Sequence, residues 1–248
     1  MSLEAEPLGP LHLGPVPPAE AALLSARVAA LRAALAEAAV AAGRSPDSVR
    51  LLLATKTQSA ERIAAALSGG HRLIGENRAQ ELRDKFDPLR PLEPEWHFIG
   101  PLQRNKLRMV VGRAALIHSI DSLGLAQAVG EERLRQGGQE PQKVLLQVNI
   151  SGEATKSGAH PEAALALARA VVELPGVALV GLMAIPAADA TPEEARQAFA
   201  RLAGLAAAGR AEGLPLRELS MGMSGDYPQA VAEGATLVRV GSAIFGAR

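Results

Sequence analysis

The sequence predicts an α/β protein: a single-domain (β/α)₈ barrel of the TIM type with an extra N-terminal helix. The first observation is that eight short apolar or β-branched runs alternate with helical stretches over about 200 residues, as parallel strands joined by helical crossovers do. The second is size, because 248 residues, 48% of them hydrophobic, suffice for one large core. No further hydropathic region follows residue 240, so we expect no second domain.

The elements follow one another in a regular order. Residues 1–17 are expected to form a Pro-rich flexible arm, and residues 18–248 the barrel domain. Pro17 and Pro18 open a long amphipathic helix that ends near Gly43, since glycine suits the position after a helix. Strands are predicted over residues 50–55, 72–74, 96–99, 115–119, 143–150, 177–183, 216–220 and 236–240. The helices after them are predicted over residues 60–67, 77–86, 104–111, 123–136, 161–174, 192–208 and 227–233, with a short segment after the last strand.

A doubly wound open sheet is the alternative fold for the same alternation. Its nucleotide-binding versions carry a glycine-rich fingerprint after the first strand, whereas this chain has ATKT at residues 54–57. No GxxxxGK[ST] motif occurs either. These two observations favour the barrel.

Composition excludes several classes of function. With 26 basic and 26 acidic residues the chain has no overall charge for nucleic acid or a membrane surface, and without Cys it has no disulfides or thiolate metal sites. The first twenty residues contain no Lys or Arg and do not resemble an export leader, and no apolar run is long enough to span a bilayer. We therefore expect a cytoplasmic protein that binds neither nucleic acid nor membrane.

Chemistry in a barrel lies where the strands end, and here those positions are rich in glycine, amide and hydroxyl groups. The ring of carboxylates typical of metal-dependent barrels is missing, and the five His residues show no metal-binding spacing. We expect no metal site. His118 and Asp121 are three residues apart at a strand end, which we interpret as a hydrogen-bonded turn and not as an acid/base pair.

Glycine-bearing turns after the seventh and eighth strands predict a phosphate site. Residues 220–225 read SMGMSG, and Gly241 and Ser242 follow the last strand. Glycine lets the backbone approach an anion closely, hydroxyls add donors, and this is the usual phosphate position of the fold. The alternative is that these glycines only make turns.

Lys56 is a candidate for covalent chemistry because it follows a buried run at the end of the first strand. Partial removal from water favours a neutral amine, which can form a Schiff base with an aldehyde. By position alone, a strand-end lysine that reaches for water is the favoured interpretation. Together with a phosphate site in the same mouth, it indicates an aldehyde phosphate, and pyridoxal 5′-phosphate is the obvious molecule.

Arg239 lies on the last strand, where period-two alternation places it on the same face as Leu237. If that face is the interior, the guanidinium stands at the mouth; if not, it pairs with an outer helix. Beside a pyridine nitrogen, a guanidinium would keep that nitrogen unprotonated and make the ring a poor electron sink.

Eight ordered motifs resemble the pyridoxal phosphate homeostasis family, known as YggS in bacteria and PROSC in animals, whose fold is similar to the N-terminal barrel of alanine racemase. They are ATKT (54–57), IGENRAQE (74–81), WHFIGPLQRNK (96–106), HSID (118–121), QVN (147–149), GLM (181–183), LSMGMSGD (219–226) and VRVGSAIFG (238–246). One departure is Arg78, where many members have Tyr. The resemblance covers residues 45–248.

The resemblance implies a role for each of eleven residues. Lys56 would carry the Schiff base, and Arg239 would face the pyridine nitrogen. Ser220, Ser224, Gly241 and Ser242 would hold the phosphate, and Asn77, His97, Asn149, Met183 and Met221 would line the mouth.

The implied function is reversible binding of pyridoxal 5′-phosphate, with delivery to pyridoxal phosphate-dependent apoenzymes or buffering, and without turnover. An amino-acid racemase that uses the same Schiff base is the main alternative, and a Schiff-base aldolase acting on a sugar phosphate is the other.

Overall fold

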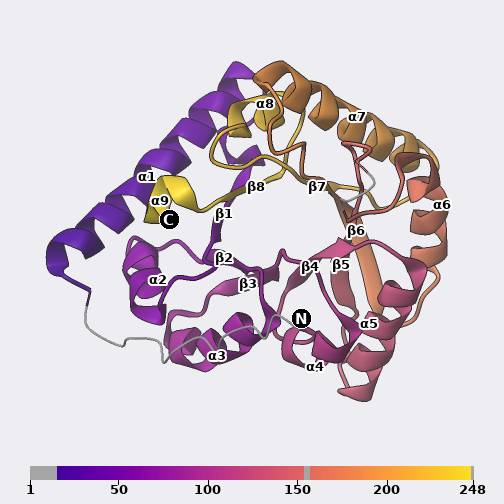
Figure 1. Cartoon of the computed structure of the whole chain (residues 1–248), viewed down its shortest axis with the longest axis horizontal. Helices are drawn as coiled ribbons and strands as arrows, with labels where there is room; N and C mark the ends of the chain where they lie inside the picture. The colour runs from indigo at the N-terminus through magenta and orange to yellow at the C-terminus, as the bar shows by residue number, and fades with distance from the viewer. Residues whose placement is uncertain (1–15, 154–156, 247–248) are drawn as a thin grey trace, which may run out of the picture.

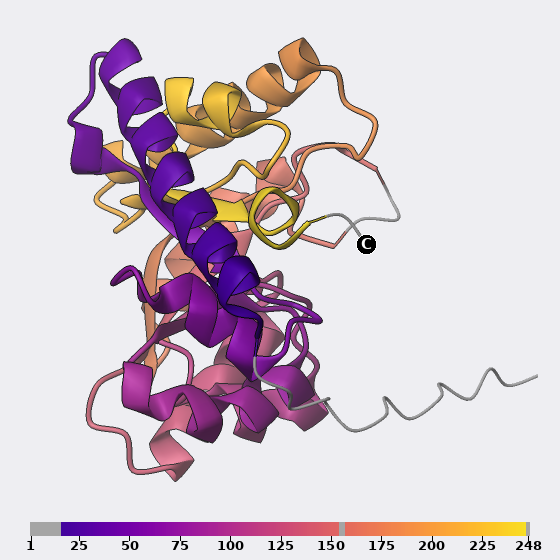
Figure 2. The ribbon, with the colours of Figure 1, turned by 90° about the vertical axis from the view of Figure 1, so that its left-hand side faces the viewer.

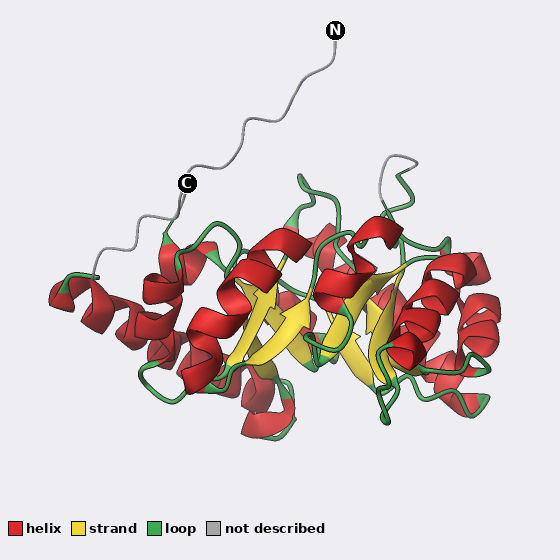
Figure 3. Cartoon of the chain, turned by 90° about the horizontal axis from the view of Figure 1, so that it is seen from below, coloured by secondary structure: helices red, strands yellow, loops and turns green. Residues whose placement is uncertain are grey.

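The structure is a computed structural model that describes residues 16–153 and 157–246. Eight parallel strands form one closed barrel in the order β1-β2-β3-β4-β5-β6-β7-β8, and helices surround it (Figures 1 and 3). The predicted (β/α)₈ barrel with its extra N-terminal helix is confirmed. Of the predicted arm over residues 1–17, residues 1–15 lie outside the described residues.

The strands are short and lie close to their predicted positions. They are β1 (Arg50–Ala54), β2 (Leu73–Glu76), β3 (Glu95–Phe98), β4 (Leu116–Ile120), β5 (Gln142–Gln147), β6 (Val177–Met183), β7 (Glu218–Ser220) and β8 (Leu237–Val240). The helices are α1 (Pro18–Ala41), α2 (Ala60–Leu67), α3 (Ala79–Leu89), α4 (Leu107–Val110), α5 (Leu123–Arg135), α6 (Pro161–Val172), α7 (Pro192–Ala211), α8 (Tyr227–Ala232) and α9 (Ser242–Phe245). Single 3₁₀ turns are η1 (Pro46–Ser48), η2 (Arg90–Leu92) and η3 (Arg104–Lys106).

The core has two layers, because successive side chains of a strand point alternately into the barrel and toward the helices. The outer layer, between strands and helices, is the larger of the two clusters. The inner layer fills the barrel with a small set of apolar side chains: Leu52, Leu73, Leu116, Leu145, Met183 and Leu237. The barrel interior is therefore packed, and a ligand has room only at its ends.

Helix α1 packs across the outside of the barrel and reaches α9 near the C-terminus (Figure 2). Its buried side chains Leu24, Val28, Leu35 and Ala39 recur at helical spacing on one face. Arg27 Nη1 donates a hydrogen bond of 2.9 Å to the carbonyl oxygen of Ile244. The first helix thus fixes the segment that follows β8.

The described residues contain neither a membrane-spanning helix nor a cluster of metal ligands. None of the described helices is long and apolar enough to cross a membrane. Within the same residues no three His, Asp or Glu side chains lie together as metal ligands would.

Candidate functional site

A cavity of about 390 Å³ lies at the carboxyl ends of β1 and β8. It brings together five of the eleven predicted residues: Lys56, Ser224, Arg239, Gly241 and Ser242. Its remaining walls are residues that sequence analysis did not single out, namely Ala54, Thr57, Gln58, Met223, Gly225, Phe245 and Gly246. Three of these, Thr57, Met223 and Gly225, directly neighbour predicted residues in the chain, and Ala54, Phe245 and Gly246 belong to the motifs quoted above, which is the signal that could have found them.

Two hydroxyls meet on one wall of this cavity. The Ser242 hydroxyl donates to Ser224 Oγ at 3.0 Å, and the N–H of Ala243 lies 3.4 Å from the same oxygen. Ser224 comes from the loop between β7 and α8, and Ser242 begins α9 directly after β8. The two turns predicted to hold a phosphate are therefore neighbours in space.

Glycines allow the backbone to approach closely at this wall. A Cβ on Gly241 would lie 3.1 Å from the carbonyl oxygen of Ala54 at the end of β1. Gly222, with φ of +91°, holds the preceding loop in the left-handed region, and a Cβ there would lie 2.6 Å from that of Ala230. A larger residue at Gly222 would displace the loop that carries Ser224, and a larger residue at Gly241 would press against the end of β1.

Lys56 is half-buried in a turn after β1 and lines the cavity. The structure shows no hydrogen bond or ion pair to its amine from any described residue. The residue before it, Thr55, is buried, and the residue after it, Thr57, is exposed. The Lys56 amine therefore has no protein partner among the described residues.

Arg239 lies on the interior face of β8, like Leu237 of the inner layer, so the prediction that the two share a face is confirmed. Its side chain is 5% exposed, and it donates to Ser220 Oγ at 2.5 Å and to the carbonyl oxygen of Ala184 at 3.0 Å. Burial lowers the pKa of Arg239 to about 10, against a smaller upward effect of Asp226. The guanidinium is therefore still charged at neutral pH. It has five N–H donors in all, so donors remain besides those that bind Ser220 and Ala184.

Ser220 does not line the cavity. Its hydroxyl is fully buried between Arg239 and His118 Nδ1, which is 2.9 Å away. Ser220 ends β7 with its side chain directed into the barrel, and the strand alternation then turns Met221 toward the outer layer. The structure thus separates both residues from the wall on which Ser224 lies.

His97 lies in the barrel and not at the mouth where we expected it. Its Nδ1 is 2.9 Å from His118 Nε2, and its Nε2 is 2.9 Å from Glu95 Oε1 at the start of β3. It lines a separate cavity of about 310 Å³ at the amino ends of the strands. His118, which we interpreted as part of a turn, instead bridges His97 and Ser220 across the barrel.

These contacts form a chain of hydrogen bonds from Arg239 to Glu95. The bond from His97 lowers the pKa of the Glu95 carboxyl to about 2, so that group is an acceptor. Burial lowers the pKa of His97 and, more strongly, that of His118, so both rings are neutral. A neutral His97 that donates to Glu95 must accept at Nδ1, so His118 donates from Nε2 and accepts from the Ser220 hydroxyl.

The other three predicted residues also lie away from the cavity. Met183 is 1% exposed within the inner layer of the barrel. Asn77 packs against Gly100, where a Cβ would lie 2.0 Å from the Asn77 carbonyl oxygen, and its own Oδ1 has no partner. Asn149 donates from Nδ2 to the carbonyl oxygen of Glu153 in the loop after β5.

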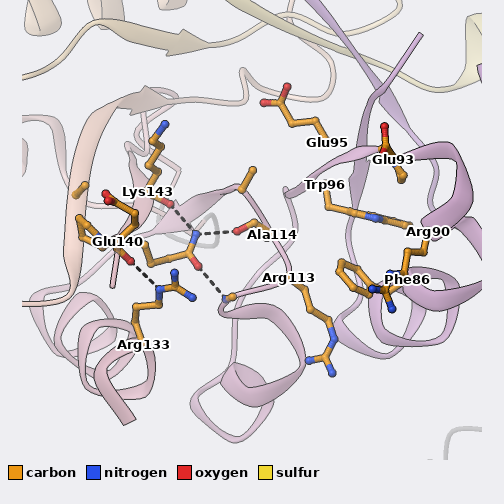
Figure 4. A pocket seen from close by; sticks show the side chains of 16 residues that line it. Phe86, Arg90, Glu93, Glu95, Trp96, Arg113, Ala114, Arg133, Glu140 and Lys143 are labelled. Carbon is orange, nitrogen blue, oxygen red and sulfur yellow. Dashed lines mark hydrogen bonds between the residues drawn. The ribbon is translucent and has the colours of Figure 1, made fainter. Parts of the chain in front are cut away.

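A larger cavity of about 890 Å³, at the amino ends of β3 to β6, contains none of the predicted residues (Figure 4). Several of its polar groups are paired with the protein. Gln142 Nε2 donates to the Ala114 carbonyl oxygen at 2.9 Å, and Arg133 Nε donates to that of Glu140 at 2.8 Å. The Arg113 guanidinium lies 5.8 Å from the ring centre of Phe86. We interpret this cavity as a structural groove.

Comparison with known proteins gives a consistent picture of relatives. Residues 27–248 match the family described as alanine racemase, N-terminal domain. The chain is 47% identical over 227 residues to the pyridoxal phosphate homeostasis protein of Pseudomonas aeruginosa, covering 91% of this chain and 96% of that protein. It is 44% identical over 226 residues to the Escherichia coli protein of the same name, covering 89% and 95%.

Solved structures resemble the whole chain. PipY of Synechococcus elongatus with pyridoxal phosphate bound has a TM-score of 0.78 at 36% identity, with 90% of this chain and 100% of that chain covered. An unknown protein from Bifidobacterium adolescentis has a TM-score of 0.89 at 38% identity, with 95% and 99% covered. D-threonine aldolase from Filomicrobium marinum, at 17% identity and a TM-score of 0.69, shares the fold alone.

Proposed function

Because the chain belongs to the pyridoxal phosphate homeostasis family, within the larger family of alanine racemase N-terminal barrels, we propose that it binds pyridoxal 5′-phosphate reversibly in the cytoplasm and delivers or buffers it for apoenzymes. The observation that supports this most is the joint lining of one cavity by the Lys56 amine, the Arg239 guanidinium and the Ser224–Ser242 hydroxyl pair.

The residues present fit this cofactor. A phosphate needs hydrogen-bond donors and a close backbone, which the hydroxyl pair and Gly241 provide on one wall. An aldehyde needs a free amine, and that of Lys56 has no partner among the described residues. A pyridine nitrogen needs a donor, and the guanidinium of Arg239 is held at the base of the cavity by Ser220 and Ala184. When bound, the cofactor would supply the electrophilic aldehyde carbon.

Each residue then has a defined task. Lys56 would hold the aldehyde end of the cofactor through a reversible condensation, with one water molecule lost on binding and regained on release. Ser224, Ser242 and the Gly241 backbone would bind the phosphate. Arg239 would donate to the ring nitrogen and keep it unprotonated, which would weaken the electron sink needed for transamination.

Binding without turnover is supported by the walls of the cavity. A two-base racemase needs a second proton-transfer group on the face of the cofactor opposite the lysine. Among the described residues that line the cavity there is no His, Tyr, Asp or Glu. Tyr227 starts α8 and packs against the outer layer of the core.

The test is to titrate the purified protein with pyridoxal 5′-phosphate, follow visible absorbance, reduce with borohydride and map the peptides. We expect a yellow complex with the adduct on Lys56, none in Lys56→Ala, and an unchanged adduct in Lys106→Ala. Transfer of the cofactor to an added apoenzyme is expected to restore that enzyme's activity. Racemisation of a common amino acid at about 1 s⁻¹ or faster, abolished by Lys56→Ala, would establish the racemase instead.

A further inference from the structure

The main chain is fixed on both sides of Lys56 by side chains of α3. Lys85 Nζ donates to the carbonyl oxygen of Thr55 at 3.1 Å. The N–H of Thr57 donates to Glu81 Oε2 at 2.7 Å. Lys85 and Glu81 are one helical turn apart, and Lys85 Nζ lies 2.8 Å from the same Glu81 oxygen. One ion pair thus holds the residue before Lys56 and the residue after it.

Glu76, at the end of β2, completes this buried group. It is 0% exposed, and its Oε1 accepts from Lys85 Nζ at 2.8 Å and from Thr55 Oγ1 at 2.7 Å. Burial raises the pKa of the Glu76 carboxyl, while the ammonium of Lys85 and the Thr55 hydroxyl oppose the rise. Its Oε2 has no hydrogen-bond partner among the described residues. Buried ion pairs add little net stability, because removing both charges from water offsets their attraction.

The turn that these side chains hold is strained. Thr57 has φ of +64°, in the left-handed region that a β-branched residue rarely adopts. Such a conformation persists only where the surrounding structure enforces it. Here the bond from the Thr57 N–H to Glu81 and the bond from Lys85 to the Thr55 carbonyl oxygen impose it on the residue that follows Lys56.

We propose that Lys85 and Glu81, supported by Glu76, act as a clamp that directs the Lys56 amine toward the Ser224–Ser242 wall. We call these three residues the α3 clamp. They are positioning residues, because none of them lines the cavity. The proposal rests on the proposed function of Lys56 as the residue that bonds to the aldehyde.

Lys85 itself is not the reacting amine. Its side chain is 1% exposed, and each of the three N–H groups of its ammonium has an acceptor, in Thr55, Glu76 and Glu81. An ammonium with all its protons engaged has no electron pair for attack on an aldehyde.

The experiment separates docking from bond formation by using two ligands. Pyridoxine 5′-phosphate has the ring and the phosphate but no aldehyde, so its affinity, measured by calorimetry, reports docking alone. Pyridoxal 5′-phosphate adds the bond to Lys56, followed by absorbance and by the borohydride-trapped fraction. For Lys85→Met we expect unchanged affinity for the first ligand and a rate of bond formation to the second lower by about tenfold or more.

Two further variants keep the result decisive. Glu81→Gln preserves shape and is expected to slow bond formation less than Lys85→Met does, so it serves if that variant fails to fold. Arg44→Met is the matched control: Arg44 is a half-buried cation that donates to the carbonyl oxygens of Val231 and Ala235 away from the cavity. We expect it to lower stability and leave bond formation unchanged.

The outcomes are distinct. Wild-type rates in Lys85→Met, or equal losses with both ligands, would overturn the clamp and leave the proposed function standing. An adduct found on Lys85 in the wild-type protein would overturn the clamp as well. A wild-type protein that forms no adduct on Lys56 would overturn the proposed function, and the clamp with it.

Discussion

Arg239 is the residue at which the packed barrel interior and the cavity meet. The chain of hydrogen bonds behind it has a fixed polarity, which predicts that His97 and His118 both carry their proton on Nε2. Nitrogen-15 NMR of the imidazole rings at neutral pH measures this directly. A proton found on Nδ1 of His118 would contradict the polarity, because Ser220 would then accept from both sides.

A negative charge placed in the cavity wall that carries Ser224, Ser242 and Gly241 is predicted to expel an anionic ligand. We expect Gly241→Asp and Ser224→Asp each to weaken binding of pyridoxal 5′-phosphate by at least about 1–4 kcal/mol, because a carboxylate would face a phosphate dianion in a partly dry site.

The neutral variants Gly241→Asn and Ser224→Asn have nearly the same shape and serve as controls, so the difference between each pair isolates charge from crowding. Equal affinities for Asp and Asn at both positions, measured by fluorescence titration, would place the phosphate elsewhere.

The face of the barrel on which a strand residue lies could be predicted only in part from the sequence. On β8 alternation alone left the face of Arg239 undecided but tied it to Leu237, and the structure places both inside. On β6 the pairing with β5 shifts register between Val144 and Leu145, and Met183 ends in the inner layer. The extra residue lies in β6, because Val144 pairs with Leu179 and Leu145 pairs with Gly181, and a glycine inside a strand is only a weak sign of such a shift.

The end of the barrel toward which an interior side chain leans is also hidden from the sequence. His97 lies on the inner face of β3, but its ring extends toward Glu95 at the amino end because a carboxylate accepts there. By contrast, Lys56, Ser224 and Gly241 follow strand ends in loops that can only lie at the carboxyl side. Those placements were predictable from topology, and these three residues line the cavity, although Asn77 and Asn149 also follow strand ends and do not line it.

Helix α1 is predicted to stabilise the fold through one narrow face. Leu24 is 1% exposed and packs in the outer core, whereas its neighbour Leu23 is 48% exposed. We expect Leu24→Ala to lower the free energy of unfolding by about 2–5 kcal/mol, through lost burial and a residual cavity, and Leu23→Ala to change it little. Urea unfolding of the two variants measures the contrast; equal losses would mean that α1 packs differently.

For the molecule as a whole, buried histidines link stability to pH. Burial lowers the pKa of His71, His97 and His118, so the folded chain keeps them neutral where unfolded histidine, with a pKa near 6.5, binds protons. Their contribution to stability is therefore present above about pH 6.5 and is lost as the pH falls below it. Glu76 acts in the opposite sense, since its raised pKa favours the protonated folded state at acid pH.

A single variant isolates one of these contributions. In His118→Gln the amide can replace both hydrogen bonds but does not titrate. Between about pH 7.5 and about pH 5.5 we expect wild type to lose up to about 1.4 kcal/mol more unfolding free energy than this variant. Denaturant unfolding at the two pH values tests it, and parallel losses would mean that His118 is protonated in the folded protein.

The cavity also lies where the first and last strands pair and close the barrel. Strands β1 and β8 pair from Arg50 with Leu237 to Leu53 with Val240, and the cavity walls come from the residues that directly follow these two strands and from the loop after β7. Contacts so distant along the chain close late in folding, because the entropy of ring closure must be overcome first. A ligand of this cavity binds only the closed barrel. Added pyridoxal 5′-phosphate should therefore leave the folding rate unchanged and slow unfolding, and the gain in stability should grow as the logarithm of its concentration.

Stopped-flow kinetics would show a shift in the unfolding arm alone, so that binding of the cofactor would report whether the barrel has closed.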